Sequence, residues 1–204
     1  MNIFFDFDGT LLESRPRVFN LFNSLSGNTI ISYDEYWQLK RNMFSNEWIL
    51  THILRQSNED ISNFKNEWFN LIESEEFLEY DRIFNFTIPT LEKIENNKLY
   101  IVTSRMLVEP LNKQVESFGL KKYFNDVLVS RNQISKKDLI SGTGLKLSAN
   151  DIIIGDTEAD IIAARELNIR SFSVLSGFRS YEVLSQYKPN KIFINISETI
   201  SELQ

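Results

Sequence analysis

The sequence predicts an α/β fold, a doubly wound parallel sheet that carries a small inserted α-helical domain. Three observations favour this class. Short apolar runs alternate with helical patterns along most of the 204 residues. The runs are apolar nearly throughout, which is typical of strands covered by helices on both faces. The stretch from about Arg15 to about Phe86 breaks this alternation and shows helical spacing alone.

Six apolar runs are expected to form the strands, and they cover residues 2–5, 98–102, 126–129, 151–154, 171–175 and 191–194. Helical patterns lie between them. Val108, Leu111 and Val115 share one helical face, and Gly119 is a stop signal after them. Repeated β–α alternation of this kind predicts right-handed crossovers and a sheet enclosed between helices.

Residues 15–86 are expected to form the inserted helical domain, and residues 1–14 and 87–204 the α/β domain. Pro16 and Pro89 lie near the two edges of the insertion. Its apolar anchors recur at helical spacing: Tyr36, Trp37, Met43, Phe44, Trp48, Phe64, Trp68, Leu71 and Ile72. This spacing indicates the core of a small bundle rather than a surface that stacks bases or cofactors.

The composition narrows the function classes. The chain has 22 Lys and Arg against 28 Asp and Glu, a formal net charge of −6, which argues against binding to nucleic-acid polymers or anionic membranes. The absence of Cys and a single histidine, His52, exclude disulfides, thiolate metal sites and sites built from several histidines. The N-terminus lacks a signal-peptide pattern, and no apolar run approaches the ~20 residues of a membrane span. We therefore expect a cytoplasmic protein, monomeric or homodimeric.

Two carboxylates directly follow the first expected strand. Asp6 and Asp8 lie in the segment Asp-Phe-Asp-Gly-Thr and point to the same side if the strand continues through Phe7. Paired carboxylates in a buried position repel each other and require a cation or hydrogen-bond donors. Because open α/β sheets bind ligands at the carboxyl ends of their strands, these residues predict a functional site there.

A second acidic pair follows the fourth expected strand. Asp156 and Asp160 are four residues apart, so a helix that begins near residue 156 would place both carboxylates on one face of its N-terminus. The same spacing suits a helix N-cap with an acidic first turn, and the spacing alone leaves both interpretations open. Together with Asp6 and Asp8, an oxygen ligand set without a histidine or cysteine cluster favours Mg²⁺.

Four segments, in the right order, resemble the motifs of the haloacid dehalogenase superfamily of aspartate-nucleophile phosphohydrolases. They are Asp6 to Thr10, Ile101-Val102-Thr103, Ser135-Lys136-Lys137-Asp138-Leu139, and Gly155-Asp156 followed by Asp160. The resemblance implies a Rossmann-like core and identifies residues 15–86 as a helical cap, as in phosphoglycolate phosphatase-like members. The second aspartate of the first motif resembles the phosphatase and phosphomutase branch, since dehalogenases of the family lack it.

The resemblance also implies roles for the acidic residues. Asp6 is expected to be the nucleophile that forms an aspartyl-phosphate, and Asp8 the general acid and base. Mg²⁺ would be held by Asp6, the backbone carbonyl of Asp8 and Asp156. Asp160 would either bind the ion directly or support its ligands.

Residues in or directly after the second and third motifs are expected to hold the phosphate group. Thr103 would offer its hydroxyl, Ser104 its amide and Lys136 its charge. Lys137 is the alternative to Lys136, because adjacent lysines are often both solvated and the family's proline after this lysine is absent. Arg105 is a further candidate for substrate binding because it lies just after the second motif.

The function that the resemblance implies is a Mg²⁺-dependent phosphatase of a small phosphorylated metabolite, whose cap closes over Asp6. Three residues of the helical domain are additional candidates for substrate contact: Arg41, His52 and Arg55. A phosphomutase with the same residues is an alternative enzyme. A phospho-accepting signalling or binding module is the alternative from another class, although there the acceptor aspartate follows the paired acids, whereas Asp6 belongs to the first pair.

Overall fold

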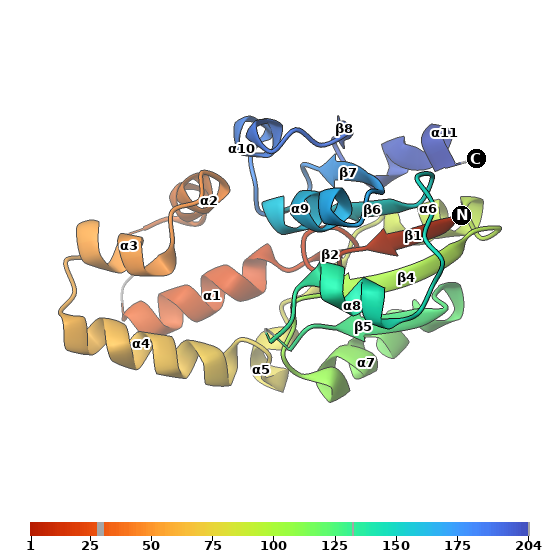
Figure 1. Ribbon diagram of the computed structural model, residues 1–204. Coiled ribbons are helices and arrows are strands. Elements are labelled where there is room, and N and C mark those ends of the chain that lie inside the picture. The colour runs from red at the N-terminus through yellow and green to blue at the C-terminus, as the bar shows by residue number, and fades with distance from the viewer. Residues whose placement is uncertain (28–30, 132, 204) are drawn as a thin grey trace.

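A six-stranded parallel sheet forms the centre of the larger part of the molecule (Figure 1). This computed structural model describes residues 1–27, 31–131 and 133–203. The strand order is β5-β4-β1-β6-β7-β8. The strands are β1 (Asn2–Phe5), β4 (Lys98–Thr103), β5 (Asp126–Val129), β6 (Ile152–Gly155), β7 (Arg170–Val174) and β8 (Lys191–Phe193). Each neighbouring pair is parallel, so the predicted doubly wound α/β class is confirmed.

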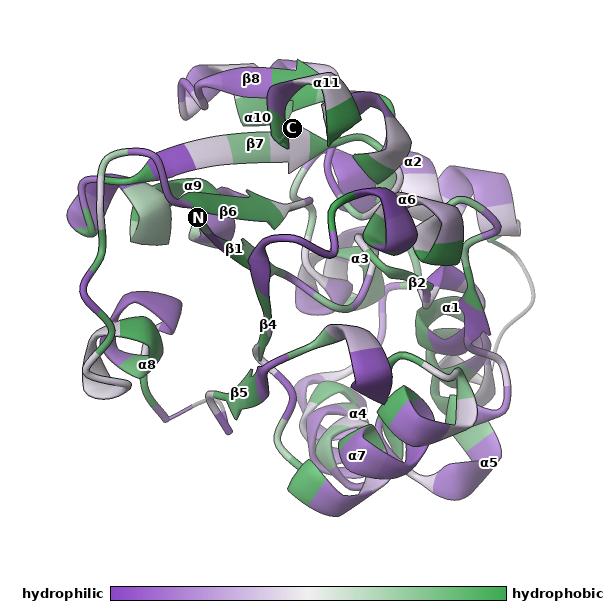
Figure 2. Cartoon of the chain, turned by 90° about the vertical axis from the view of Figure 1, so that its right-hand side faces the viewer, coloured by the Kyte–Doolittle hydropathy of each residue, from purple (hydrophilic) through white to green (hydrophobic). Residues whose placement is uncertain are grey.

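Helices cover both faces of the sheet because successive strand residues point to opposite sides. Ile3 and Phe5 of β1 pack in one apolar cluster with α6 (Thr87–Lys93), α7 (Val108–Ser117) and the C-terminal turns η2 (Ile196–Thr199) and α11 (Ile200–Leu203). Phe4 packs in another with α8 (Lys136–Gly142) and α9 (Glu158–Glu166). Figure 2 shows β1 and β6 as hydrophobic strands enclosed in this way. The remaining elements are η1 (Lys121–Tyr123) and α10 (Tyr181–Gln186).

Five helices between β1 and β4 form what we call the helical lobe (residues 15–27 and 31–78). They are α1 (Arg15–Ser26), α2 (Tyr33–Arg41), α3 (Asn46–His52), α4 (Asn58–Leu71) and α5 (Glu75–Leu78). The lobe lies beside the sheet, toward the carboxyl end of β1 (Figure 1). Ser32, Ser45 and Ser57 accept hydrogen bonds from the first turns of α2, α3 and α4, which explains where these helices begin.

Most of the apolar residues expected to anchor the helical lobe pack in or against its core, but two of them do not. Tyr36, Trp37 and Phe64 are buried in one cluster, as the helical spacing predicts. Met43 and Phe44, also expected as core anchors, are exposed. Helix α2 ends at Arg41 and Met43 adopts a left-handed φ of 69°, so the helical period on which that expectation depended stops before these residues.

A two-stranded antiparallel sheet joins the helical lobe to the rest of the chain. It pairs β2 (Leu12–Glu13) with β3 (Arg82–Ile83). Strands of two residues are too short for an alternating pattern, which is why the sequence did not predict β3. The division into residues 15–86 and the remainder stays a prediction. In the described part of the chain, no helix has the length and apolar character that crossing a membrane requires.

Candidate active site

Asp6 lies directly after the central strand β1, where the chain order of the strands reverses. β4 and β5 extend the sheet on one side of β1, and β6 to β8 extend it on the other. The amide of Asp6 still donates to the carbonyl of Ile154, which fixes the start of the turn. Its side chain is 9% exposed, and its Oδ1 accepts a hydrogen bond of 2.6 Å from Lys136 Nζ. Such a reversal point is where open α/β sheets bind ligands.

Asp156 lies against Asp6 from the neighbouring strand β6. Its side chain is fully buried, and its Oδ2 accepts a hydrogen bond of 2.6 Å from the amide of Phe178. Two glycines leave room for this carboxylate. Gly9 has a φ of 83°, and a Cβ on either Gly9 or Gly177 would collide with Asp156 Oδ2. The chain therefore reserves space around this oxygen that any larger residue would close.

Asp160 occupies the third position of helix α9, and both of its carboxylate oxygens have partners. Its Oδ2 accepts from the amide (3.2 Å) and hydroxyl (2.8 Å) of Thr157, which is the helix N-cap. Its Oδ1 accepts from Lys136 Nζ at 2.6 Å. Asp160 thus caps the helix and at the same time holds Lys136 beside Asp6.

Asp6, Asp156 and Asp160 form a buried carboxylate cluster that carries more negative than positive charge. One oxygen from each lies within 4.8 Å of the others. Burial is the main cause that raises the pKa of Asp6, to about 6, against the opposing charge of Lys136. Burial, with Asp6 and Asp160 nearby, raises the pKa of Asp156 well above its ordinary value. Burial by itself would lower the pKa of Lys136. The negative charges of Asp160 and Asp6 outweigh this effect and raise the pKa overall.

These residues fit a divalent cation that prefers oxygen ligands. Three carboxylates face one ammonium group, so the cluster lacks the positive charge that would balance it. Asp6 binds Lys136 through Oδ1 alone, and Asp156 Oδ1 accepts only a long hydrogen bond of 3.5 Å from the hydroxyl of Thr10. Both oxygens of Asp160, in contrast, accept short hydrogen bonds, from Thr157 and Lys136. The geometry therefore favours a supporting role for Asp160.

The side chain of Asp8 belongs to a different group, the arginine cluster of Asp8, Arg17, Asp81 and Arg105. Arg105 binds the Asp8 carboxylate through two hydrogen bonds of 2.8 Å, and Arg17 of helix α1 donates to the same carboxylate. Both arginines also pair with the buried Asp81, at 3.1 and 3.0 Å. Burial alone would raise the pKa of Asp8, but Arg105 and Arg17 hold it well below its ordinary range.

A cavity of about 380 Å³ opens over Asp6 between the sheet and the helical lobe. Thr103, Ser104 and Lys136, which the sequence predicts as phosphate ligands, line it. Lys137 does not line it, because its side chain lies on the surface and pairs with Asp138 at 2.9 Å. The volume is at the lower end of the range for ligand sites, which suits a small molecule.

The helical lobe touches the sheet domain around this cavity through two further sets of contacts. The buried carboxylate of Glu73 accepts hydrogen bonds of 2.8 Å from the amides of Met106 and Leu107, after β4. On the other side, the C-terminus of α2 meets the loop after β7. Arg41 donates to the carbonyl of Leu175 at 2.9 Å, and its own carbonyl accepts from the amide of Ser180 at 3.0 Å.

Sequence reasoning missed several of the residues that shape the site. Arg17, Lys40, Glu73 and Arg179 line the cavity, and Asp81 completes the arginine cluster. Each is a charged residue on or beside an amphipathic helix. From a single sequence, such a residue is expected to point into solvent. The proximity of Arg17 to the first motif, nine residues after Asp8, is the one local signal that could have pointed to it.

The three additional candidates for substrate contact from the helical lobe, Arg41, His52 and Arg55, do not lie at the cavity over Asp6. Arg41 binds backbone carbonyls of the loop after β7. His52 is exposed and its ring stacks on Trp48 at 4.7 Å. Arg55 is exposed as well, and none of the three lines the cavity.

A doubly wound sheet with a buried carboxylate cluster at its reversal point, enclosed by an inserted helical lobe, defines an α/β enzyme. The sequence matches the family model of haloacid dehalogenase-like hydrolases over residues 3–174. The chain therefore belongs to the haloacid dehalogenase-like hydrolase family, which confirms the expected family and the expected hydrolase class. No curated protein matches the sequence.

Several solved structures share the fold over nearly their whole length. A haloacid dehalogenase-like hydrolase from Streptococcus pneumoniae is 24% identical, with a TM-score of 0.80 over 100% of this chain and 98% of that one. A predicted phosphatase from Clostridium acetobutylicum is 20% identical, with a TM-score of 0.76 over 99% and 97%. A predicted phosphoglycolate phosphatase from Haemophilus somnus is 21% identical, with a TM-score of 0.73 over 99% and 97%. At these identities the likeness shows the fold.

Proposed function

We propose that the chain is a Mg²⁺-dependent phosphatase that hydrolyses a small phosphorylated metabolite through an aspartyl-phosphate on Asp6. The observation that carries this proposal is the position of the Asp6 carboxylate, which is bound by Lys136, accompanied by Asp156 and next to a cavity of about 380 Å³. The names of the structural relatives, which include phosphatases, point the same way.

Asp6 and Asp8 divide the chemistry between them. A carboxylate oxygen of Asp6 attacks the phosphorus, and the bond from phosphorus to the ester oxygen breaks. Asp8 gives a proton to that leaving oxygen. Asp8 then takes a proton from water as the water attacks the phosphorus, which releases inorganic phosphate and restores Asp6.

The arginine cluster decides in which protonation state Asp8 begins. Arg17 and Arg105 hold the pKa of the Asp8 carboxyl well below its ordinary range, so Asp8 is ionised in the free protein. This is the form that can act as the base toward water. To act as the acid, Asp8 must leave at least one of these arginine contacts, and Arg17 is part of the helical lobe. We propose that the lobe, as a cap, couples its own position to the state of Asp8 in this way.

Mg²⁺ would be held by Asp6, the backbone carbonyl of Asp8 and Asp156, with Asp160 as a support. When bound, the ion compensates the charge of the carboxylates and of the phosphate that arrives. Lys136 supplies a fixed positive charge beside Asp6, and Thr103 and Ser104, which line the cavity, would donate hydrogen bonds to the phosphate oxygens.

The test is phosphate release from a panel of phosphate esters, with Mg²⁺ or with EDTA. We expect Mg²⁺-dependent turnover by the wild type, and turnover reduced by at least about 1,000-fold in Asp6→Asn and Asp8→Asn. Asp34→Asn, at an exposed aspartate of α2, is the matched control and should retain wild-type activity. Release of phosphate by Asp6→Asn at the wild-type rate would disprove the nucleophile assignment.

The same assay separates the alternatives. Transfer of the phosphoryl group to a second hydroxyl, without phosphate release, would indicate a phosphomutase. Stable phosphorylation of Asp6 without turnover would indicate a phospho-accepting module. The cytoplasmic location, the monomeric or homodimeric state and the absence of nucleic-acid binding stay predictions.

A further inference from the structure

The cavity over Asp6 is lined by five cationic side chains, and four of them already have acidic partners. Arg17 and Arg105 bind Asp8 and Asp81. Lys136 binds Asp6 and Asp160, and Arg179 forms two hydrogen bonds of 2.7 and 2.9 Å with Glu158. The fifth cation is Lys40, near the end of helix α2.

Lys40 carries a positive charge that no acidic group balances. Among the residues that the structure describes, its Nζ has neither a hydrogen-bond acceptor nor an ion-pair partner. Its side chain is half-buried. Burial, with Arg179 nearby, lowers the pKa of Lys40 to about 8. An anion that enters the cavity would compensate this charge.

Lys40 lies at the end of the cavity that is lined by the helical lobe. Together with Trp68 and Phe69, it also lines an adjoining cavity of about 320 Å³, whose other residues come from the lobe alone. Asp6 and Lys136 line only the first cavity. Residues shared by two cavities lie at the boundary between them, so Lys40 and the carboxylate cluster occupy different ends of the space.

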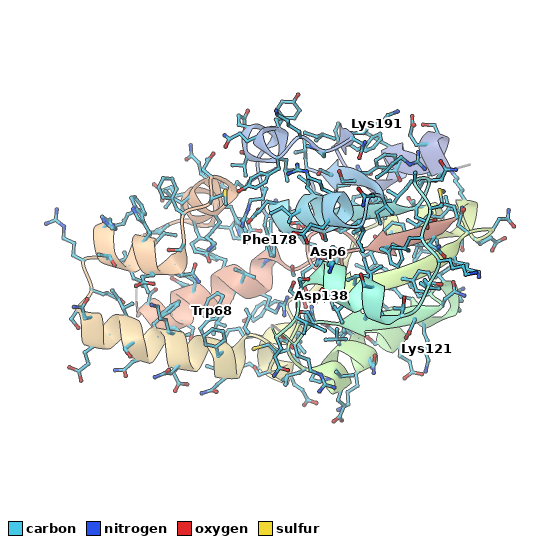
Figure 3. All side chains as sticks on the ribbon, in the orientation of Figure 1. Asp6, Trp68, Lys121, Asp138, Phe178 and Lys191 are labelled. Atoms are coloured by element: carbon cyan, nitrogen blue, oxygen red, sulfur yellow. The ribbon has the colours of Figure 1, made fainter. Side chains whose placement is uncertain are left out.

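Four aromatic side chains line the part of the cavity that faces the helical lobe. Trp37, one helical turn before Lys40 on the same face of α2, stacks on Phe178 with the ring centroids 5.2 Å apart. Trp68 and Phe69 contribute from α4. Figure 3 shows Asp6 at the end of β1, with Phe178 beside α2 and Trp68 in the helical lobe. Flat aromatic walls favour a ligand with a flat, apolar body.

From this arrangement we infer that the cavity accepts a phosphate monoester with a flat apolar body and a carboxylate at the far end, which Lys40 binds. The inference rests on the proposed phosphatase function and names the class of ester. A carboxylate carries the single negative charge that one ammonium group matches. Lys40 is thus a binding residue that determines specificity, separate from the residues that act on the phosphorus.

The experiment compares two esters that differ only at the end away from the phosphate. The probes are 4-(carboxymethyl)phenyl phosphate and its neutral isostere 4-(carbamoylmethyl)phenyl phosphate, assayed with Mg²⁺. We expect the wild type to prefer the carboxylate ester by about tenfold in kcat/KM, the effect of one charge-assisted hydrogen bond. Lys40→Met should abolish this preference through KM, with kcat nearly unchanged, and Lys40→Arg should keep it.

The matched control is Lys65→Met, at an exposed lysine of α4 that pairs with Glu47 and lines only the adjoining cavity. It should leave the preference unchanged. Equal kcat/KM values for the two esters in the wild type would overturn the inference while the phosphatase function stands. So would a preference that survives in Lys40→Met, because Lys40 would then serve only the C-terminus of α2.

A binding measurement keeps this inference separate from the proposed chemistry. Calorimetric titration of Asp6→Asn with each ester, in the presence of Mg²⁺, does not depend on turnover. Tighter binding of the carboxylate ester that is lost on adding Lys40→Met supports the inference even if no ester is hydrolysed. Equal binding of the two esters contradicts it, whatever the turnover.

Discussion

Two buried clusters of charged residues lie on either side of Phe7, and they are compensated differently. In the carboxylate cluster, Asp6, Asp156 and Asp160 face a single ammonium group, that of Lys136. In the arginine cluster, two carboxylates face two guanidinium groups. The first cluster has a net negative charge that a bound cation would balance. In the second cluster the positive and negative charges balance each other. The difference teaches that burial of charge marks a binding site only where the partners are too few.

Removal of a carboxylate from the first cluster should therefore abolish function and preserve the fold. We expect Asp156→Asn to reduce Mg²⁺-dependent kcat/KM by about 1,000-fold. Its melting temperature in EDTA should equal or exceed that of the wild type, because Asp156 already lies in an environment that raises its pKa. Activity assays and thermal unfolding in EDTA check the two halves. A large loss of metal-free stability would remove the distinction between the clusters.

Removal of an arginine from the second cluster should do the opposite and weaken the fold itself. Arg105→Met leaves the carboxylates of Asp8 and Asp81 buried with only one guanidinium group between them. We expect the free energy of unfolding to fall by about 3–5 kcal/mol, measured by urea denaturation. Arg55→Met, at an exposed arginine of the helical lobe, is the control and should change it by less than about 0.5 kcal/mol.

Asp6 and Asp8, one from each cluster, should also contribute opposite dependences of stability on pH when Mg²⁺ is absent. The pKa of Asp6 is raised from 3.8 to about 6, so the native state binds more protons than the unfolded state in that window. The free energy of unfolding should therefore fall as pH rises from about 4 to 6, by of order 3 kcal/mol for Asp6. The pKa of Asp8 is lowered, so Asp8 adds to the free energy of unfolding at every pH above its ordinary pKa. This contribution is lost as the pH falls below that value.

Mg²⁺ and Asp6→Asn separate these two effects in denaturation series at several pH values. Saturating Mg²⁺ should restore about 2.7 kcal/mol at 100 times its dissociation constant, and only above pH 6, where the carboxylates are ionised. Asp6→Asn should reduce the fall between pH 4 and 6 by the share of Asp6, leave the share of Asp156, whose pKa burial also raises, and leave the acid limb in place. An unchanged fall in Asp6→Asn would assign it to another group.

The smallest expected effect concerns the helix cap that positions Asp160. Thr157→Val removes the hydroxyl that donates to Asp160 Oδ2 at 2.8 Å. The free energy of unfolding should fall by about 1 kcal/mol, and Thr157→Ser should restore it. Urea denaturation of the three proteins measures this. If Thr157→Val were as stable as the wild type, the hydroxyl would contribute nothing to the cap.

The fold was predictable because its signals are local. Each of the six expected strands is a short apolar run, and each is present in the sheet with its limits shifted by at most one residue. The acidic pairs follow two of these runs directly, so their convergence at the carboxyl ends of β1 and β6 follows from parallel pairing. The family expectation depended on the same segments and is confirmed.

The partners of Asp8 were not predictable from one sequence, because they come from distant positions. Asp8 is 97 residues from Arg105, and Arg105 is 24 from Asp81. Nothing in the helical spacing of Arg17 or Lys40 separates a buried partner from a solvated one. The opposite failure occurred at Met43 and Phe44, whose apolar side chains suggested a core that α2 does not reach.

Phe178, in the loop after β7, connects the carboxylate cluster to the helical lobe. The amide of Phe178 holds Asp156 at 2.6 Å, while its ring stacks on Trp37 of the lobe. One residue is thus shared by the carboxylate cluster and by the contact between the lobe and the sheet. A cation that changes the position of Asp156 is therefore expected to change the contact of Phe178 with Trp37. By linkage, a change in that contact should alter the affinity for the cation by the same factor.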